Sequence, residues 1–243
     1  MQNAVANLTH NWIPESFQSS ADALATDATN KYVNEGFIIG LGSGPMAAAV
    51  VRALGNFHGK KSLRCIVTSQ QIKLEAIKAG LEVVDENRMP EIDVVFDGAD
   101  EVDSQLNMIK GGGGGALLRE KIVHAAAKQV VIAAENSKFV EKFTWPVPIE
   151  VHPFAISIVY NELIKKGGAP KARMLKEGYP YITENGNLIL DTHFDLANVD
   201  IHKEEIELRS IPGIQEVGLF SKKANVYYKA KTDGTFEAIT PTS

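Results

Sequence analysis

Short apolar runs alternate with helical patterns through the first half of the chain, and this alternation constrains the fold more than any other feature. The expected strands are 37–41, 64–68, 82–85, 93–96 and 129–134, and the expected helices are 21–33, 46–54, 70–79 and 116–128. Strands that are apolar on both faces and separated by helices favour a parallel sheet covered on both sides. We therefore predict an α/β fold for this half of the chain.

The second half of the chain has a different pattern, which begins near the prolines at 146 and 148. These prolines indicate a crossover between two parts of the fold. The pattern beyond them predicts helices over 155–166 and 203–209, a hairpin of strands 181–183 and 188–190 around 184–187, and two strands within 225–239 joined at 233–234. Helices and hairpins that do not alternate are typical of an α+β segment.

Charge and hydropathy exclude several classes of partner. The chain has 25 Lys and Arg against 30 Asp and Glu, a formal net charge of −5, and no block of like charges. A nucleic-acid-binding protein usually carries a basic surplus, so we expect no nucleic-acid partner, although a small anion needs only one or two cations. Since no apolar run approaches the roughly 18 residues that span a bilayer, we expect no membrane partner.

The N-terminus and the cysteine content bear on the compartment. Residues 1–20 show neither a basic stretch nor a continuous apolar stretch of the kind found in secretion signals. Cys65 is the single cysteine, so an internal disulfide is impossible, and we expect a cytoplasmic location. Cys65 falls within a predicted strand, where a packed thiol is expected.

In an open parallel sheet, ligands bind beyond the carboxyl ends of the strands, so the loops there are the first candidates for a site. The first such loop is Gly40-Leu41-Gly42-Ser43-Gly44-Pro45. The dinucleotide-binding fingerprint requires glycine where Pro45 stands, so that fingerprint fails. The loop is either a phosphate-binding turn with free backbone amides at a helix start, or a tight turn that only needs small residues.

The second loop, Asp97-Gly98-Ala99-Asp100-Glu101, places three carboxylates directly after the strand 93–96. Carboxylates close together raise one another's pKa, and this can produce proton carriers near neutral pH. The alternative is an acidic, solvated turn with a helix cap. The position at a strand's carboxyl end favours a functional role.

The third loop contains Lys110 and five consecutive glycines, Gly111–Gly115, before the helix that carries Glu120. Glycine loses more backbone freedom on folding than any other residue, so a run of five is tolerated where the backbone must approach a ligand closely. Amides at a helix N-terminus form an anion cradle, to which Lys110 adds charge. The alternative for Glu120 is a surface residue paired with Arg119, Lys121 or Lys128.

Two further observations complete the list of candidates. Lys138 follows the strand 129–134, where it is either a second phosphate contact or a solvated side chain. The six histidines are scattered at 10, 58, 124, 152, 193 and 202, without the spacing of metal ligands. We therefore expect no metal site.

Several motifs together closely resemble ribose-5-phosphate isomerase type A. They are Asp97–Glu101, Met108–Gly111, Leu118–Lys121, Asn136–Lys138, Val147–Val151, Asn185–Asn187, Ile211–Gly213 and Val217–Phe220. The similarity runs in order through roughly residues 21–240, which is far more specific than any single motif. It implies interconversion of D-ribose 5-phosphate and D-ribulose 5-phosphate in the non-oxidative pentose phosphate pathway, with no cofactor.

The resemblance also implies a domain arrangement. A Rossmann-like catalytic domain would comprise residues 1–144 and 221–243, with a smaller inserted α+β domain over 145–220. By the same resemblance we expect a homodimer or homotetramer.

The family's site residues carry over by position. Glu120 would be the base that moves a proton between C1 and C2 through an enediolate, and Lys110 would stabilise the developing negative charge. Asp97 and Asp100 would assist ring opening and proton movement at the sugar oxygens. The implied substrate-binding residues are Ser43, Gly44, Pro45, Met46, Asp97, Gly98, Ala99, Asp100, Lys110, Gly111, Gly112, Gly113 and Lys138.

The sequence departs from the family pattern at two places near the implied site. The first loop usually contains further hydroxyl residues, but here reads Ser43-Gly44-Pro45-Met46, and proline also lacks an amide donor. The glycine run is one residue longer than usual, so the extra residue must bulge. Two alternatives to the leading function therefore stay open: a non-catalytic sugar-phosphate sensor, and an isomerase for a different sugar phosphate.

Overall fold

The computed structural model describes residues 13–85, 91–113 and 115–241. These residues form two compact units. The first unit takes in the described residues of 1–98, 122–137 and 224–243, and the second takes in those of 99–121 and 138–223. The segment 99–121 thus clusters with the second unit, whereas the sequence-based division assigns it to the first domain. That division, 1–144 with 221–243 against 145–220, stays a prediction.

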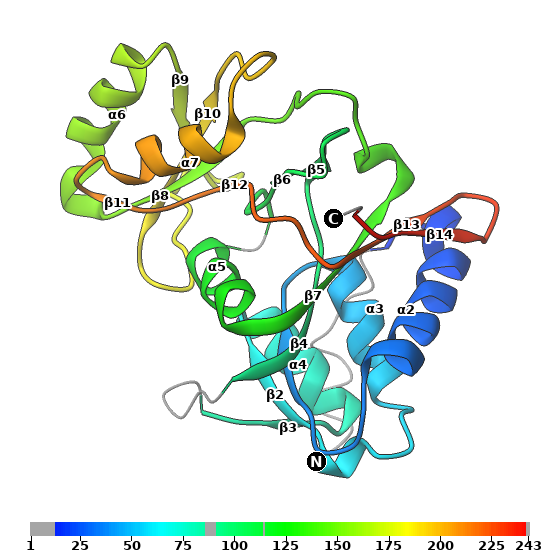
Figure 1. Cartoon of the computed structure of the whole chain (residues 1–243). Coiled ribbons are helices and arrows are strands. Elements are labelled where there is room, and N and C mark those ends of the chain that lie inside the picture. Colours follow the sequence, from blue (N-terminus) through cyan, green and yellow to red (C-terminus); the bar gives the residue numbers. More distant parts are fainter. Residues whose placement is uncertain (1–12, 86–90, 114, 242–243) are drawn as a thin grey trace. The chain divides into compact units, whose positions relative to one another are not determined.

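The first unit is built on a seven-stranded sheet with the order β14-β13-β7-β4-β1-β2-β3 (Figure 1). Its strands are β1 (Ile38–Leu41), β2 (Arg64–Val67), β3 (Glu82–Val83), β4 (Ile92–Asp97), β7 (Ala127–Glu135), β13 (Val226–Ala230) and β14 (Phe236–Ile239). All neighbouring pairs are parallel except β13 and β14, which form an antiparallel hairpin at the edge. The predicted parallel sheet is therefore confirmed.

Alternate side chains of the central strands point into two different apolar layers. Ile39 of β1 and Cys65 of β2 belong to one buried cluster, and their neighbours Ile38 and Ile66 belong to another. Side chains of a strand alternate between the two faces of the sheet, so a strand buried on both faces must be apolar at every position. This requirement explains the continuous apolar runs in the sequence.

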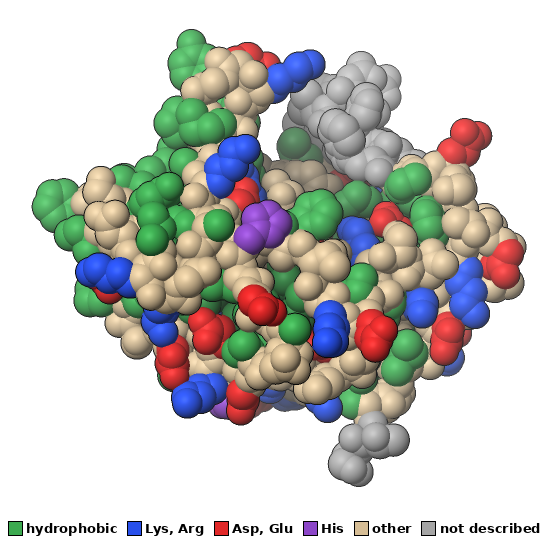
Figure 2. Space-filling view, turned by 90° about the horizontal axis from the view of Figure 1, so that it is seen from above, with side chains coloured by type: hydrophobic (Ala, Val, Ile, Leu, Met, Phe, Trp, Pro, Cys, Tyr) green, Lys and Arg blue, Asp and Glu red, His purple; other side chains and the backbone are tan. Residues whose placement is uncertain are grey.

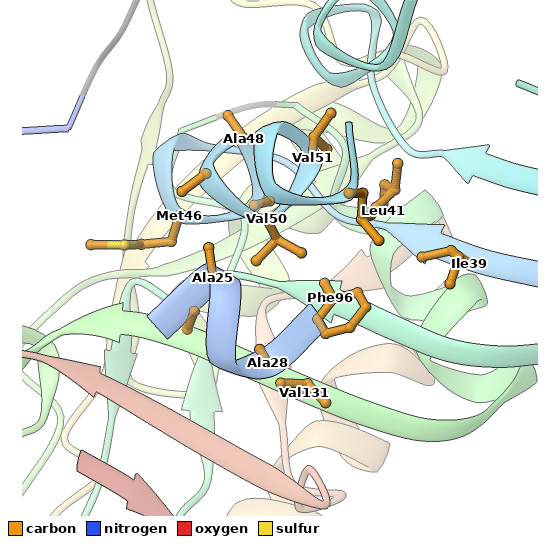
Figure 3. Packing of buried hydrophobic residues seen from close by; sticks show 14 of the residues in the cluster. Ala25, Ala28, Ile39, Leu41, Met46, Ala48, Val50, Val51, Phe96 and Val131 are labelled. Carbon is orange, nitrogen blue, oxygen red and sulfur yellow. The ribbon is translucent and has the colours of Figure 1, made fainter. Parts of the chain in front are cut away.

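Helices cover both faces of this sheet. The helices of the first layer are α2 (Gln18–Tyr32), α3 (Pro45–Leu54) and α4 (Gln70–Ala79), with the short 3₁₀ turns η1 (Glu15–Phe17) and η2 (Lys60–Ser62). Small residues such as Ala25 and Ala28 let α2 approach α3 closely, and Val50 of α3 points towards Phe96 of the sheet (Figure 3). Val123, near the end of α5 (Leu117–Ala126), packs in the opposite layer.

The second unit contains two smaller antiparallel sheets and two helices. The four-stranded sheet has the order β11-β8-β10-β9, and the three-stranded sheet has the order β12-β6-β5. The strands are β5 (Glu101–Val102), β6 (Met108–Ile109), β8 (Val147–Val151), β9 (Ala169–Ala172), β10 (Leu188–His193), β11 (Ile214–Val217) and β12 (Leu219–Phe220). The helices are α6 (Ile156–Lys165) and α7 (Ile201–Arg209), with the 3₁₀ turn η5 (Pro153–Ala155). The 3₁₀ turn η4 (Asn136–Lys138) lies at the boundary, with Lys138 in the second unit.

One buried cluster organises this unit. Ile149 of β8, Leu163 of α6 and Leu208 of α7 all belong to it, and all three side chains are fully buried. Ile109 of β6 is part of the same cluster, so the three-stranded sheet is anchored in the same core. The second unit therefore has the α+β character that the sequence predicts for the part of the chain outside the parallel sheet.

Three local predictions differ from the structure. The helix expected over 116–128 ends at Ala126, because Ala127 already pairs with Ile92 in the sheet. Only an isolated bridge between Ile182 and Leu188 replaces the expected strand 181–183. Strand β8 lies where a crossover was predicted, and it contains Pro148.

Figure 2 shows acidic and basic side chains interspersed over the face in view, as the mixed charge pattern of the sequence predicts. Within residues 13–85, 91–113 and 115–241, no helix is long and apolar enough to cross a membrane.

Candidate active site

A buried ion pair joins Lys110 and Glu120 in the second unit. Lys110 directly follows β6, and Glu120 lies in the first turn of α5. The Lys110 Nζ lies 3.1 Å from Glu120 Oε2, and the two side chains are only 3% and 6% exposed. Burying either charge alone would be costly, so each compensates the other. The interpretation of Glu120 as a surface residue paired with its helix neighbours is therefore wrong.

Two neighbouring strands hold the backbone before Lys110. Ile109 pairs with Leu219 of β12 on one side and with Glu101 of β5 on the other. The backbone N–H of Lys110 donates to the carbonyl of Gly218 at 2.9 Å. The ammonium group therefore extends from a rigid strand end.

The start of α5 is held by a buried carboxylate from β8. Glu150 is fully buried, and its Oε2 accepts a hydrogen bond from the backbone N–H of Leu118 at 3.1 Å. Its Oε1 accepts from the Thr183 hydroxyl and from the Asn187 side-chain amide, at 2.9 and 2.8 Å. A negative charge at a helix N-terminus satisfies a free N–H and interacts favourably with the helix dipole. Glu150 thereby fixes the turn that carries Glu120.

Asp100 is bonded to the glycine loop. The Asp100 N–H donates to the carbonyl of Ile109, and its Oδ2 accepts from the N–H of Gly112 at 2.6 Å. A Cβ added at Gly112 would lie 2.8 Å from the Asp100 carboxylate, a distance too short for any side chain. This close approach is the physical reason for glycine at position 112.

Side chains of the second unit engage the carbonyls of the same loop. Arg173 Nη1 donates to Gly111 O at 2.8 Å, and the Tyr181 hydroxyl donates to Gly113 O at 3.2 Å. Burial raises the pKa of the Tyr181 phenol, with the Arg173 charge opposing this effect in part, so the hydroxyl stays a donor. Gly111 has a φ of +94°, which a glycine adopts without strain. The loop is therefore ordered through its carbonyl oxygens.

In the first unit, Asp97 ends strand β4 and is 1% exposed. Its Oδ2 lies 2.8 Å from His124 Nε2, and its Oδ1 accepts from the N–H of Gly98 at 2.7 Å. A Cβ at Gly42 would lie 2.0 Å from the Asp97 carboxyl group, so only glycine fits there. Asp97 is therefore a buried, histidine-paired carboxylate and not a solvated turn residue.

The first loop is held by hydroxyl groups within the same unit. Ser43 Oγ lies 2.8 Å from both Thr68 Oγ1 and Ser69 Oγ, and the N–H of Gly44 donates to Gln71. Gly44 caps the start of α3, where Pro45 is the first residue. Met46 is 3% exposed and packs in the core. A ligand at this loop would therefore meet backbone groups and not the Met46 side chain.

The predicted site residues fall into both units. Ser43, Gly44, Pro45, Met46, Asp97 and Gly98 belong to the first, and Ala99, Asp100, Lys110, Gly111, Gly112, Gly113, Glu120 and Lys138 belong to the second. In the second unit the structure brings together Lys110 with Glu120 and Asp100 with Gly112. Lys138 lies in η4 and is half-buried. Among the described residues, no group of three His, Cys, Asp or Glu side chains is placed to hold a metal ion.

Sequence reasoning missed four residues that support these groups, namely Glu150, Arg173, Tyr181 and His124. His124 lies one turn after Glu120 on α5, but histidines were considered only as metal ligands. Glu150 is part of a motif shared with the family, and a carboxylate inside an apolar strand was a signal for a buried partner. Arg173 and Tyr181 carry no comparable signal, since their roles depend on tertiary contacts.

A Rossmann-like α/β fold and a buried carboxylate paired with a buried ammonium group are features of an enzyme that moves a proton next to a carbonyl. The family "Ribose 5-phosphate isomerase A (phosphoriboisomerase A)" matches residues 64–234 of the chain. The ribose-5-phosphate isomerase A of Methanococcus aeolicus is 41% identical over 204 residues, which are 82% of this chain and 86% of that protein. The enzyme of Thermosynechococcus vestitus is 42% identical over 200 residues, 80% and 84% of the two chains.

Solved structures give the same result. Ribose 5-phosphate isomerase A from Methanocaldococcus jannaschii superposes with a TM-score of 0.83 at 32% identity, covering 91% of this chain and 98% of its own. The enzyme from Neisseria gonorrhoeae gives a TM-score of 0.84 at 32% identity, covering 94% and 99%. The chain belongs to the ribose 5-phosphate isomerase A family and is therefore an aldose–ketose isomerase.

Proposed function

We propose that the chain interconverts D-ribose 5-phosphate and D-ribulose 5-phosphate, with Glu120 as the catalytic base and Lys110 as the cation that stabilises the intermediate. The single observation that carries the assignment of roles is the buried pair of Lys110 and Glu120, 3.1 Å apart. Membership of the family supports the choice of substrate.

The reaction requires one carbon-bound proton to move between neighbouring carbons. Glu120 takes the proton from C2 of the open-chain aldose, and the electrons of the broken C–H bond form an enediolate. The ammonium of Lys110 offsets the negative charge that develops on the oxygen of C1. Glu120 then returns the proton to C1, and O2 becomes the carbonyl of the ketose. A fixed cation in a water-poor site stabilises such a charge far better than solvent does.

Protons must also move between the sugar oxygens, and the furanose ring must open. We assign these steps to Asp100 and Asp97. Asp100 is half-buried and retains Oδ1 for a substrate hydroxyl, since the N–H of Gly112 engages its Oδ2. Asp97, paired with His124, would exchange protons through that pair.

The phosphate and hydroxyl groups of the substrate need donors. We propose that the backbone segments Gly111–Gly113, Ser43–Met46 and Gly98–Ala99 and the ammonium of Lys138 supply them. The N–H groups of Gly112, Gly98 and Gly44 are bonded to Asp100, Asp97 and Gln71, so the donors are the other N–H groups of these segments. A D-ribose-5-phosphate isomerase that superposes with a TM-score of 0.83 was solved in complex with phospho-erythronic acid, which supports a sugar phosphate as the ligand class. The proposed chemistry uses no metal or cofactor, so turnover should persist after treatment with EDTA.

Two variants test the proposal directly. Purified protein is incubated with ribose 5-phosphate, and ribulose 5-phosphate is measured. Wild-type protein should turn over, and Glu120→Gln should lose at least about a thousandfold in kcat, because the base is gone while its shape is kept. Glu162→Gln, an exposed carboxylate on α6, is the matched control and should keep wild-type rates. Turnover by Glu120→Gln near the wild-type rate would exclude Glu120 as the base.

We also propose that the chain forms a homodimer or homotetramer. Exposed apolar side chains on the second unit support this assembly: Phe154 is 91% exposed, and Ile158 and Ile164 of α6 are also exposed. A contiguous exposed apolar patch on a protein surface often marks an interface. Light scattering coupled to size-exclusion chromatography would measure the mass, and a monomer at micromolar concentration would contradict the proposal.

A further inference from the structure

The ring of Phe220 contacts two lysines of the second unit. The Lys121 Nζ lies 3.7 Å from the ring centroid, and the Lys110 Nζ lies 5.6 Å from it. An ammonium within about 6 Å of a ring face is attracted by its quadrupole. Phe220 is only 4% exposed, so water screens these interactions little. The Phe220 side chain thus links the ammonium of Lys110, the proposed catalytic cation, to the ammonium of Lys121.

Lys121 is held firmly in this position. Its Nζ donates to Glu205 Oε1 at 2.6 Å and to the backbone carbonyl of Leu219, and it lies 3.9 Å from Glu216 Oε1. Burial lowers the pKa of Lys121, and the two carboxylates oppose that effect. The mechanism proposed above makes no use of this lysine.

Glu205 is itself oriented by hydrogen bonds. Its Oε2 accepts from the N–H of Ser221 at 2.9 Å and from the Ser221 hydroxyl at 2.6 Å. Burial raises the pKa of the Glu205 carboxyl, but the Lys121 charge and these hydrogen bonds outweigh burial, so its pKa is lowered overall. Glu205 therefore offers Lys121 a charged partner in a fixed place.

The arrangement connects the two elements that carry the base and the cation. Lys121 follows Glu120 on α5, and its contacts to Leu219 and Phe220 fasten α5 to β12. Strand β12 in turn pairs with β6, the strand that Lys110 directly follows. Any shift of α5 along β12 would therefore change the distance between the Glu120 carboxylate and the Lys110 ammonium.

We propose that Lys121 and Phe220 form a clamp, locked by Glu205, that positions Glu120 and Lys110 for proton transfer without touching the substrate. This inference rests on the proposed function, since it assigns Lys121 and Phe220 to the support of that same pair. Both are positioning residues, and the roles of base and cation stay with Glu120 and Lys110.

Stability alone does not account for a charged residue at position 121. A buried ion pair replaced by well-packed apolar side chains of similar volume is often neutral or stabilising, because the cost of desolvating both charges disappears. A methionine at 121 would still pack against the Phe220 ring, since sulfur contacts with aromatic rings are favourable. The Lys121 ammonium fixes the position of α5, because it binds the Glu205 carboxylate, the Leu219 carbonyl and the Phe220 ring at once.

The test separates positioning from folding. We expect Phe220→Leu, and the double variant Lys121→Met with Glu205→Gln, each to lower kcat by about tenfold or more while KM changes by less than about threefold. The double variant leaves no unpaired carboxylate at 205, so it keeps a folded protein available if Phe220→Leu unfolds. Phe220→Tyr retains the ring and should keep most of kcat.

A kinetic isotope effect provides the readout that a merely structural role would not move. With ribose 5-phosphate deuterated at C2, a misplaced base slows proton abstraction, so the isotope effect on kcat should rise in Phe220→Leu and in the double variant. A loss of folded protein would lower the apparent kcat but leave the isotope effect and KM unchanged. Lys203→Met, which is exposed on the same unit, is the control and should match wild type.

The outcomes distinguish this inference from the proposed function. If wild-type protein fails to turn over ribose 5-phosphate, the proposed function is wrong. If wild type turns over and Glu120→Gln does not, but both clamp variants keep the wild-type kcat and isotope effect, the clamp is wrong and the proposed function stands. A tenfold loss in kcat with an unchanged isotope effect would also overturn the clamp, because the chemical step would then be intact.

Discussion

The Oε2 of Glu150 accepts a hydrogen bond from the backbone N–H of Leu118, two residues before Glu120 on the same helix. A carboxylate from the four-stranded sheet thus holds the first turn of the helix that carries the proposed base. Because Glu150 is fully buried, its charge is stabilised only by these fixed donors and not by water. The site consequently depends on a residue that does no chemistry.

Glu150→Gln should destabilise the protein although the shape of the side chain is kept. One of the two acceptor oxygens becomes an NH₂ group, which faces either the Leu118 N–H or the amides of Asn185 and Asn187. A buried donor without an acceptor costs about 1–3 kcal/mol, so the free energy of unfolding should fall by that amount in urea titrations. Glu162→Gln on α6 is the exposed control, and equal stability of the two variants would contradict the assigned role.

The Lys110–Glu120 pair should show strong coupling in a double-mutant cycle. Lys110→Met and Glu120→Gln each remove one partner of a buried pair, so each should cost about 3–5 kcal/mol of unfolding free energy. The double variant leaves no buried charge and should cost less than the sum of the two. All three should be inactive. Additive losses of stability would mean that the two groups do not interact in the folded protein.

Adjacent glycines of the loop should respond differently to alanine. A Cβ at Gly112 would lie 2.8 Å from the Asp100 carboxylate, whereas a Cβ at Gly113 meets no atom within 4 Å among the described residues. Gly112→Ala should therefore displace Asp100 and lower the free energy of unfolding by about 1–3 kcal/mol. Gly113→Ala should leave the thermal midpoint within a degree or two. A larger loss of stability in Gly113→Ala than in Gly112→Ala would show that the loop adopts another path.

His124, the buried histidine paired with Asp97, should be replaceable only by a side chain that can donate a hydrogen bond. His124→Ala removes the side chain that bonds the Asp97 Oδ2, in a carboxylate that is 1% exposed, and should cost about 2–4 kcal/mol. His124→Gln can still donate through its amide and should recover part of this loss. Urea unfolding of both variants provides the comparison. If His124→Ala and His124→Gln had identical stabilities, the hydrogen bond to Asp97 would not be the source of the loss.

Cys65 should make the stability of the protein depend on pH in the alkaline range. Burial raises the pKa of its thiol from 9.0 to about 12, with a further contribution from the Glu82 charge. Above pH 9.0 the unfolded chain releases the thiol proton and the folded chain keeps it, so stability is intact below that pH and falls as the pH rises towards 12. The loss attributable to this group should be about 2 kcal/mol near pH 10.5.

Cys65→Ala provides the measurement for this pH dependence. The variant should lack the extra alkaline slope in the free energy of unfolding, whatever its absolute stability. In native protein the thiol should also react with a thiol reagent only as fast as the chain opens, because the side chain is fully buried. Rapid labelling of folded protein at pH 8 would contradict the buried, protonated thiol.

The sequence pattern predicted the parallel sheet correctly because burial on both faces leaves an unambiguous signature in β1, β2, β4 and β7. Strand β8 escaped prediction because Pro148 argues against a strand that lies inside a sheet. The structure accommodates Pro148 one residue beyond Ile149, where the pairing of β8 with β11 ends, and its carbonyl accepts from the N–H of Gly218. Such an accommodation depends on a partner strand far away in the sequence.

In the candidate site, too, the residues could be predicted from the local sequence, whereas their long-range contacts could not. Glu120 and Lys110 were predicted from their position and from the family motifs, and their burial as a pair came only from the structure. The residues 184–187 were predicted as the turn of a hairpin. In the structure the Thr183 hydroxyl and the side-chain amide of Asn187 both donate to Glu150. Polar turn residues bond locally by default, so their use by a distant carboxylate has no signature in the local sequence.

The pairing of β6 with β12 has a consequence for how the protein is made. A nascent chain that ends before residue 219 already contains Lys110 and Glu120, but lacks the Leu219 and Phe220 that hold them in register. Contacts between segments so distant in sequence form late, after long loops have closed. We therefore expect activity only from chains that include residues 219 and 220, and chains truncated before them should be inactive.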